Sequence, residues 1–135
     1  MKTMTYITNL ILVVASIQFA FADAPDWQDD PGGYEFVSTI VAGIVQQDGE
    51  NIGGGEGDLF AAFDADGNVR GLSAPNQLLF PEFGPYAGTA VYEMTMRSNA
   101  AGDILSFQFY DSSEDAILSI SETYIFVTND QLGDV

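Results

Sequence analysis

The sequence DLFAAFDADGNVRGLS, residues 58–73, contains two short apolar runs on either side of a turn. Residues 59–63 and 68–73 are rich in apolar and small side chains, and Asp64-Ala-Asp-Gly67 lies between them. Asp and Gly are favoured in tight turns because they tolerate left-handed backbone angles. The stretch therefore predicts a β-hairpin. Asp64-x-Asp66-Gly67 resembles the start of a calcium loop, but the remaining ligands are missing, so we interpret it as the hairpin turn.

Similar β-type runs, separated by turn residues, fill the chain from Tyr34 onward. Residues 34–45 (YEFVSTIVAGIV) are nearly continuous in apolar and small side chains, as expected of a strand covered on both faces. Residues 90–97 alternate with a period of two, which is typical of a half-buried strand. Further strands are expected at residues 104–110, 116–120 and 122–127. We therefore predict an all-β fold, an antiparallel β-sandwich or jelly roll of about seven or eight strands.

The first 22 residues have the pattern of a secretory signal peptide. Lys2 precedes an uncharged stretch, residues 10–22, which closes on the small-x-small sequence Ala20-Phe21-Ala22. A single transmembrane anchor is the alternative, but the stretch is short for a bilayer span of roughly 20 residues, and acidic residues follow it. We expect cleavage before Asp23 and a secreted, extracellular or cell-surface protein. An extended acidic arm, residues 23–33, would then precede one domain, residues 34–135.

Acidic residues outnumber basic residues by 20 to 3, giving a net charge of −17. Loss of Lys2 with the signal peptide would change this to −18 and leave only Arg70 and Arg97 as cations. Two arginines cannot form the basic surface that phosphate backbones or anionic lipid headgroups require. We therefore expect no nucleic-acid partner and, in the processed chain, no membrane span.

The chain also has no His and no Cys. This excludes the usual Ser-His-Asp, Cys-His and zinc sites, and it excludes disulfides. A pair of carboxylates of the glycosidase type is the remaining enzymatic alternative, but a small domain without long inserted loops offers little cleft for it. We expect a protein that is not an enzyme.

Calcium is the ion that the acidic loops would suit best. Calcium takes about six to eight oxygen ligands, and loops supply carboxylates and backbone carbonyls together. One acidic cluster is Glu56 with Asp58, beside flexible glycines, and a second is Asp111, Glu114 and Asp115 in the turn before residue 116. We expect solvated turn residues and no cofactor, with a bound calcium ion at these clusters as the alternative.

A few aromatic residues are candidates for contacts with a ligand or a second copy of the chain. Trp27 is the only large apolar residue of the arm, and it either packs on its own domain or docks on a neighbour. Residues 74–85 carry three prolines beside apolar side chains, which must cover a sheet edge or stay exposed. The candidate contact residues are Trp27, Tyr34, Phe80, Phe83 and Tyr86.

Several motifs along the chain resemble those of a known module. They are Pro25-Asp-Trp27, Tyr34-Glu-Phe36, residues 56–63 (EGDLFAAF), residues 66–71 (DGNVRG), residues 110–115 (YDSSED) and the closing residues 126–133. Together they resemble a β-sandwich module, jelly-roll-like, that occurs, often as repeats, in secreted and cell-surface bacterial proteins. The resemblance implies an extracellular domain of structural, adhesive or polysaccharide-associated use, without an established catalytic site. Here the module stands as a single domain, so the sequence is either a fragment of a surface protein or a subunit that assembles with its own copies.

Two functional hypotheses follow. The first is a structural subunit that polymerises into an extracellular fibre or surface layer, because an arm or strand passed to a neighbour would complete the neighbour's sheet and form a homo-oligomer or helical filament. The second is a carbohydrate-binding or adhesion module whose exposed aromatic rings stack on polysaccharide. Stabilisation by calcium is compatible with both.

Overall fold

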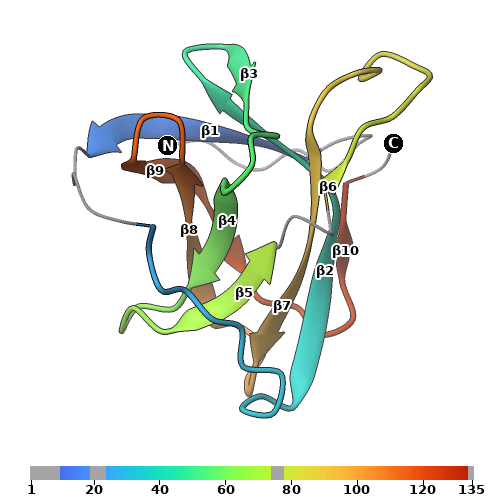
Figure 1. Cartoon of the computed structure of the whole chain (residues 1–135). Helices are drawn as coiled ribbons and strands as arrows, with labels where there is room; N and C mark the ends of the chain where they lie inside the picture. The colour runs from blue at the N-terminus through green and yellow to red at the C-terminus, as the bar shows by residue number, and fades with distance from the viewer. Residues whose placement is uncertain (1–9, 19–23, 74–77, 134–135) are drawn as a thin grey trace.

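The computed structural model describes residues 10–18, 24–73 and 78–133, and within these residues all regular secondary structure is β-strand (Figure 1). The predicted all-β class is therefore confirmed. The described residues contain no helix that is long and apolar enough to span a membrane.

Ten strands belong to one hydrogen-bonded sheet in the described part of the chain. Their order is β10-β2-β1-β9-β8-β4-β5-β7-β6, and β3 pairs with β2 beside this path. Neighbours are antiparallel, except that β1 and β10 both run parallel to β2. The strands are β1 (Leu10–Gln18), β2 (Phe36–Gln47), β3 (Glu50–Ile52), β4 (Leu59–Phe63), β5 (Val69–Ser73), β6 (Leu78–Leu79), β7 (Val91–Ser98), β8 (Ile104–Asp111), β9 (Ala116–Ile125) and β10 (Gln131–Leu132).

The sheet curls into a half-barrel because β2 has partners from both ends of the strand order (Figure 1). Residues 36–43 of β2 pair with β7, and residues 43–47 pair with β1. The predicted antiparallel sheet is thus confirmed, with β1 and β10 as its parallel members. The sheet is continuous and does not divide clearly into the two packed sheets of a sandwich or jelly roll.

The inner face of the curled sheet carries the main hydrophobic core. Leu105, Phe107 and Phe109 of β8 alternate with more exposed residues and are each at most 1% exposed, as their period-two spacing predicts. Phe60 of β4 stacks on Phe107 and meets Tyr92 of β7 edge-on, at ring-centre distances of 5.7 and 5.8 Å. Such pairs add about 0.5–1.5 kcal/mol beyond the area that they bury.

Strand β2 is covered on both faces, as its continuous apolar sequence predicts. Ile40 and Val45 belong to the main core. Ala42 and Ile44 belong to a second cluster with Val91, against which the partly buried Tyr86 packs. The loop that carries Tyr86 therefore covers the outer face of this strand.

Two details of the predicted strand pattern are wrong. One strand, β9, spans the run 116–120 and most of the run 122–127, ending at Ile125, because its residues 120–122 lie opposite the single residue Phe107 of β8. Such a bulge absorbs the extra residues and lets pairing resume beyond Ser121. The three prolines of residues 74–85 also predict that this loop lacks regular ladder pairing, but its residues 78–79 form β6 on β7. A proline removes a backbone donor only at its own position.

The predicted hairpin is present, with β4 and β5 antiparallel. The Gly67 N–H donates to the Asp64 carbonyl at 3.1 Å, and the φ of Gly67 is +84°. Asp64 Oδ1 accepts hydrogen bonds from the N–H groups of Asp66 and Asn68, both at 2.9 Å. Asp64 therefore holds the turn together, which agrees with the interpretation of this sequence as a turn.

The sheet extends beyond the expected domain of residues 34–135. Strand β1 lies within the predicted signal peptide, residues 1–22, and residues 1–9 and 19–22 of that segment lie outside the described residues. The described part of the arm, residues 24–33, contains no strand and makes a turn near its end, where the Gly33 N–H donates to the Asp30 carbonyl.

Candidate functional site

The acidic arm is fastened to its own domain at two points. Arg97 of β7 donates from Nε and Nη2 to the two carboxylate oxygens of Asp29, both at 2.8 Å. Trp27 is half-buried and meets Phe63 of β4 edge-on, with ring centres 5.2 Å apart. The hydrogen bonds from Arg97 lower the pKa of Asp29, against a smaller opposing effect of burial. Of the two alternatives for Trp27, the structure shows packing on its own domain.

The second arginine lies where the arm meets the hairpin. Arg70 Nε is 2.9 Å from Asp64 Oδ2, and Arg70 Nη1 is 3.4 Å from Asp103 Oδ2. Its guanidinium also lies over the ring of Tyr34, 4.3 Å from the ring centre. Burial alone would raise the pKa of Asp64, but hydrogen bonds from Asn68, Arg70 and the Asp66 N–H lower it. Arg70 and Arg97 are thus both engaged by carboxylates.

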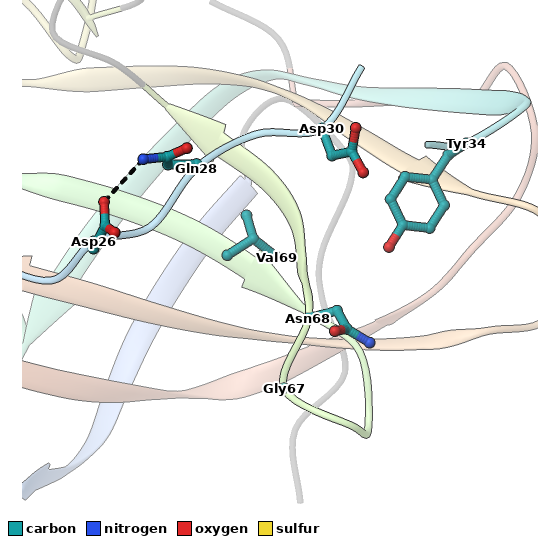
Figure 2. A pocket seen from close by; sticks show the side chains of 7 residues that line it. All are labelled: Asp26, Gln28, Asp30, Tyr34, Gly67, Asn68 and Val69. Carbon is teal, nitrogen blue, oxygen red and sulfur yellow. Dashed lines mark hydrogen bonds between the residues drawn. The ribbon is translucent and has the colours of Figure 1, made fainter. Parts of the chain in front are cut away.

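An open recess lies between the arm and the hairpin (Figure 2). Its volume is about 430 Å³. The arm provides Asp26, Gln28 and Asp30, Tyr34 follows the arm, and the hairpin contributes Gly67, Asn68 and Val69. Gln28 Nε2 donates to Asp26 Oδ1 at 3.0 Å, as Figure 2 shows. Carboxylates, amides and one aromatic ring together suit a ligand that carries several hydroxyl groups.

Of the residues that line this recess, only Tyr34 was predicted as a contact residue. Asp26, Gln28 and Asn68 were missed because their proximity arises only when the arm crosses the hairpin. The number of arginines was the available signal: two cations among 20 acids are expected to take carboxylate partners, and Asp29 of the arm is one of them.

The two predicted calcium clusters meet at Asp58. This carboxylate is 8% exposed, and its Oδ2 accepts from the Gly55 N–H at 2.9 Å. Its Oδ1 accepts from the N–H and the hydroxyl of Ser112, at 2.8 and 2.7 Å. The Ser112 hydroxyl also lies 2.7 Å from the carbonyl oxygen of Glu56. Asp58 therefore joins the glycine-rich loop to the turn between β8 and β9.

The other predicted calcium ligands also have local roles or lie on the surface. Asp111 Oδ1 accepts from the N–H and hydroxyl of Ser113, and Asp115 Oδ1 accepts from the Tyr110 hydroxyl at 2.6 Å. Glu114 is exposed. Within the described ranges, no three His, Cys, Asp or Glu side chains gather closely enough to hold a metal ion. Calcium binding by these residues stays a prediction.

The proline-rich loop leaves two aromatic rings exposed. Phe80 is 54% exposed and Phe83 is 85% exposed. Tyr86, in contrast, packs on the second core cluster. Phe80 and Phe83 of this loop are therefore exposed, as one alternative expected, whereas Tyr86 covers the sheet, as the other expected.

The candidate contact residues thus lie on two separate surfaces: the arm with its recess, and the loop with Phe80 and Phe83. Neither surface combines the acid, base and nucleophile of a familiar catalytic set. Comparison with protein-family models, with curated proteins and with solved structures finds no match to this chain.

Proposed function

We propose that this protein is a non-enzymatic, secreted structural subunit that self-assembles into an extracellular fibre or surface layer by strand addition. The observation that carries the proposal is the position of β1, which lies between β2 and β9 and comes from outside residues 34–135. A strand supplied by the N-terminal region therefore completes the sheet. Strand addition of this kind can join one subunit to the next.

The arm gives the second element of the proposal. In the single chain, Trp27 and Asp29 contact Phe63 and Arg97 of the same domain. The same contacts made to a neighbouring copy would exchange the arm between subunits, and a head-to-tail exchange propagates into a filament unless it closes into a ring. The resemblance to repeated β-sandwich modules of secreted bacterial proteins supports this extracellular role, and we propose that each subunit is one such module.

Electron microscopy and size-exclusion chromatography of the secreted protein test this function. We expect filaments or large oligomers, and we expect Trp27→Ala to reduce them. Ile125→Ala is the control, because it also removes a large apolar side chain but from an exposed position that is not a candidate contact. A monodisperse monomer at high concentration, with and without calcium, would contradict the proposal.

The recess supports one alternative, a carbohydrate-binding or adhesion module. Its wall combines the Tyr34 ring with the carboxylates of Asp26 and Asp30. The alternative predicts retention on a polysaccharide array that is lost in Tyr34→Ala and in the double variant Asp26→Ala/Asp30→Ala. Glu82→Ala is the control for a change of charge elsewhere on the surface. Equal retention of all variants would exclude the recess as the sugar site.

A further inference from the structure

Strand β1 occupies a slot between two strands that are not otherwise paired in the described part of the chain. It runs parallel to β2, from Leu10 opposite Gly43 to Val14 opposite Gln47. It then runs antiparallel to β9, from Val14 opposite Ile120 to Gln18 opposite Ile117. We call residues 43–47 of β2 and residues 117–120 of β9 the β2/β9 slot. Val14 is the one residue that is paired with both sides.

The same nine residues lie inside the segment that the sequence predicts to be removed on secretion. Their removal would leave the facing edges of β2 and β9 with unpaired backbone N–H and C=O groups. It would also remove the neighbour of Val45, Leu118 and Ile120, which are at most 6% exposed in the complete sheet. Open edges of this kind are unfavourable in isolation and readily pair with another strand.

The rest of the described chain offers no free strand for the slot. The arm is fastened elsewhere by Trp27 and Asp29, and its acids and prolines suit ladder pairing poorly. Strand β10 already pairs with the same edge of β2, at Thr39 and Ile40, before the slot begins. A strand that fills the slot after processing must therefore come from a second polypeptide.

The slot also defines the chemistry of that strand. None of its nine residues is charged, and its own occupant, LILVVASIQ, is uncharged and mainly aliphatic. A charged residue in the middle of the strand would be paired beside Val45, Leu118 and Ile120, which are buried, and it is costly to place a charge in such surroundings. The main-chain ladder supplies affinity, and the aliphatic surroundings supply selectivity.

We propose that the β2/β9 slot is an acceptor site for an extended, uncharged, aliphatic strand of about nine residues from a second polypeptide, and that Leu10–Gln18 fills it until processing. This proposal rests on the secretion that the proposed function includes, and it is independent of self-assembly through exchange of the arm. The N-terminal segment then has two roles, as a leader and as a temporary strand that keeps the two edges covered.

The test uses the full chain with a site-specific protease sequence inserted between Ala22 and Asp23. The folded chain is cut, and a fluorescent peptide of sequence LILVVASIQ is added in excess. We expect the peptide to displace the cut strand, to co-elute with the domain at one per chain, and to protect the amides of residues 43–47 and 117–120 from hydrogen exchange.

Two control peptides make the test specific. The first carries Val14→Asp, which places a charge at the position paired with both strands. The second has alternate backbone amides methylated, which removes ladder donors but keeps the side chains. We expect each to bind at least about tenfold more weakly, equal to about 1.4 kcal/mol. Equal binding of all three peptides, or no displacement of the cut strand by any of them, would overturn the proposal.

The oligomeric state of the cut and exchanged protein separates this inference from the proposed function. One peptide per monomeric domain would support the acceptor slot while contradicting self-assembly. Filaments that form without added peptide, with the same amides protected, would show that a segment of the processed chain fills the slot, and they would overturn the proposed occupant.

Discussion

Asp58 accepts three hydrogen bonds from two loops that are far apart in sequence, at Gly55 and at Ser112. Asp64 and Asp111 act in the same way within their own turns, where they accept from backbone N–H groups. Carboxylates are strong acceptors, and each N–H that they satisfy would otherwise remain without a partner in a tight loop. Part of the large negative charge therefore has a structural use in fixing turns.

Removal of the Asp58 carboxylate is expected to lower stability. Asp58→Ala leaves the Gly55 and Ser112 N–H groups without their acceptor, which should decrease the free energy of unfolding by about 2–4 kcal/mol. Urea unfolding followed by circular dichroism measures the change. Asp66→Ala, at an exposed position of the hairpin turn, should change stability by less than about 0.5 kcal/mol. Equal effects of both substitutions would contradict the role of Asp58.

Tyr92 should make stability fall at alkaline pH. Burial, followed by the nearby charges of Asp58 and Asp111, raises its pKa to about 12, although the Gly54 N–H opposes this. Because the folded state favours the neutral phenol, its contribution is complete below pH ~10, the unfolded pKa, and is lost as the pH rises toward 12. The loss should be about 2–3 kcal/mol.

Unfolding by urea at several pH values between 8 and 12 tests this dependence. Tyr92→Phe removes the acceptor of the Gly54 N–H and should cost about 1 kcal/mol at pH 7. It should also flatten the decrease in stability above pH 10, whereas Tyr86→Phe should leave that decrease as it is. The same slope in the Tyr92→Phe variant would show that other groups cause the alkaline loss.

At the scale of elements, the N-terminal strand and the arm connect to the domain in different ways. Strand β1 joins through backbone ladders with β2 and β9. The arm joins through side chains, namely Trp27 on Phe63 and Asp29 on Arg97. A ladder accepts any strand of suitable chemistry, whereas the arm contacts need these particular residues. The two elements can therefore be tested separately.

The position of β1 can be tested with a disulfide, since the chain has no native cysteine. Leu12 is opposite Val45 in the register of β1 and β2. We expect the full-length Leu12→Cys/Val45→Cys variant to form an intramolecular disulfide under mild oxidation, because cross-strand partners lie within disulfide range. Leu12→Cys/Ile104→Cys is the control and should stay reduced. Mass spectrometry after proteolysis distinguishes the two, and equal oxidation of both pairs would contradict the register.

Release of the arm should be visible in the fluorescence of Trp27, the only tryptophan of the chain. Arg97→Ala removes both hydrogen bonds to Asp29, and we expect the emission of Trp27 to shift to longer wavelength as its ring becomes more exposed to water. Asp29→Asn should give a smaller shift. The low pKa of Asp29 means that its ionised form is favoured by folding, so lowering the pH through that pKa should weaken the anchor in the native protein. Unchanged emission in Arg97→Ala would show that Trp27 packs without this ion pair.

At the scale of the whole molecule, the net charge of −17 opposes any close assembly of copies. Screening reduces this repulsion, because the Debye length falls from about 30 Å at 0.01 M salt to about 8 Å at 0.15 M. We therefore expect assembly, measured by light scattering, to increase with sodium chloride over this range. Assembly that is independent of salt would indicate that the acids lie away from the contacts between subunits.

Thermal unfolding in calcium and in sodium chloride, at matched ionic strength, tests the calcium prediction. We expect the same Tm in both salts, because Asp58, Asp111 and Asp115 already accept hydrogen bonds from the protein. A rise in Tm that is specific to calcium and reversed by a chelator would instead support a calcium-stabilised domain, since a ligand bound only by the folded state raises its stability.

Much of the sheet could be predicted from local patterns. The alternation of Leu105, Phe107 and Phe109 placed them on the core side, and the continuous apolar run of β2 indicated a strand covered on both faces. The bulge in β9 could not be predicted, because it depends on the register with β8. The curl of the sheet could not be predicted either, since it follows from the pairing of β2 with strands distant in sequence.

The candidate sites were less accessible from the sequence than the fold. Tyr34 and the acidic loops were named, but the recess forms only where the arm crosses the hairpin, and the two acidic clusters meet only because Asp58 binds Ser112. These contacts join residues that are distant along the chain, and no periodic pattern in the sequence indicates that they meet. Asp58, Asp111 and Asp115 accept hydrogen bonds that fix turns, which is a structural role. From the composition alone, the same acids could equally well be calcium ligands.

The all-β class, the hairpin at Asp64 and the buried faces of the strands could be predicted from the sequence, because each depends on neighbours along the chain, and the surplus of carboxylates is a matter of composition. Tertiary structure alone decided that the arm lies on its own domain and that the sheet is one curled surface. It also decided that the segment with the pattern of a signal peptide fits as a strand between β2 and β9. An uncharged aliphatic run is suitable for both a leader and a strand, and only its pairing with β2 and β9 indicates the second use.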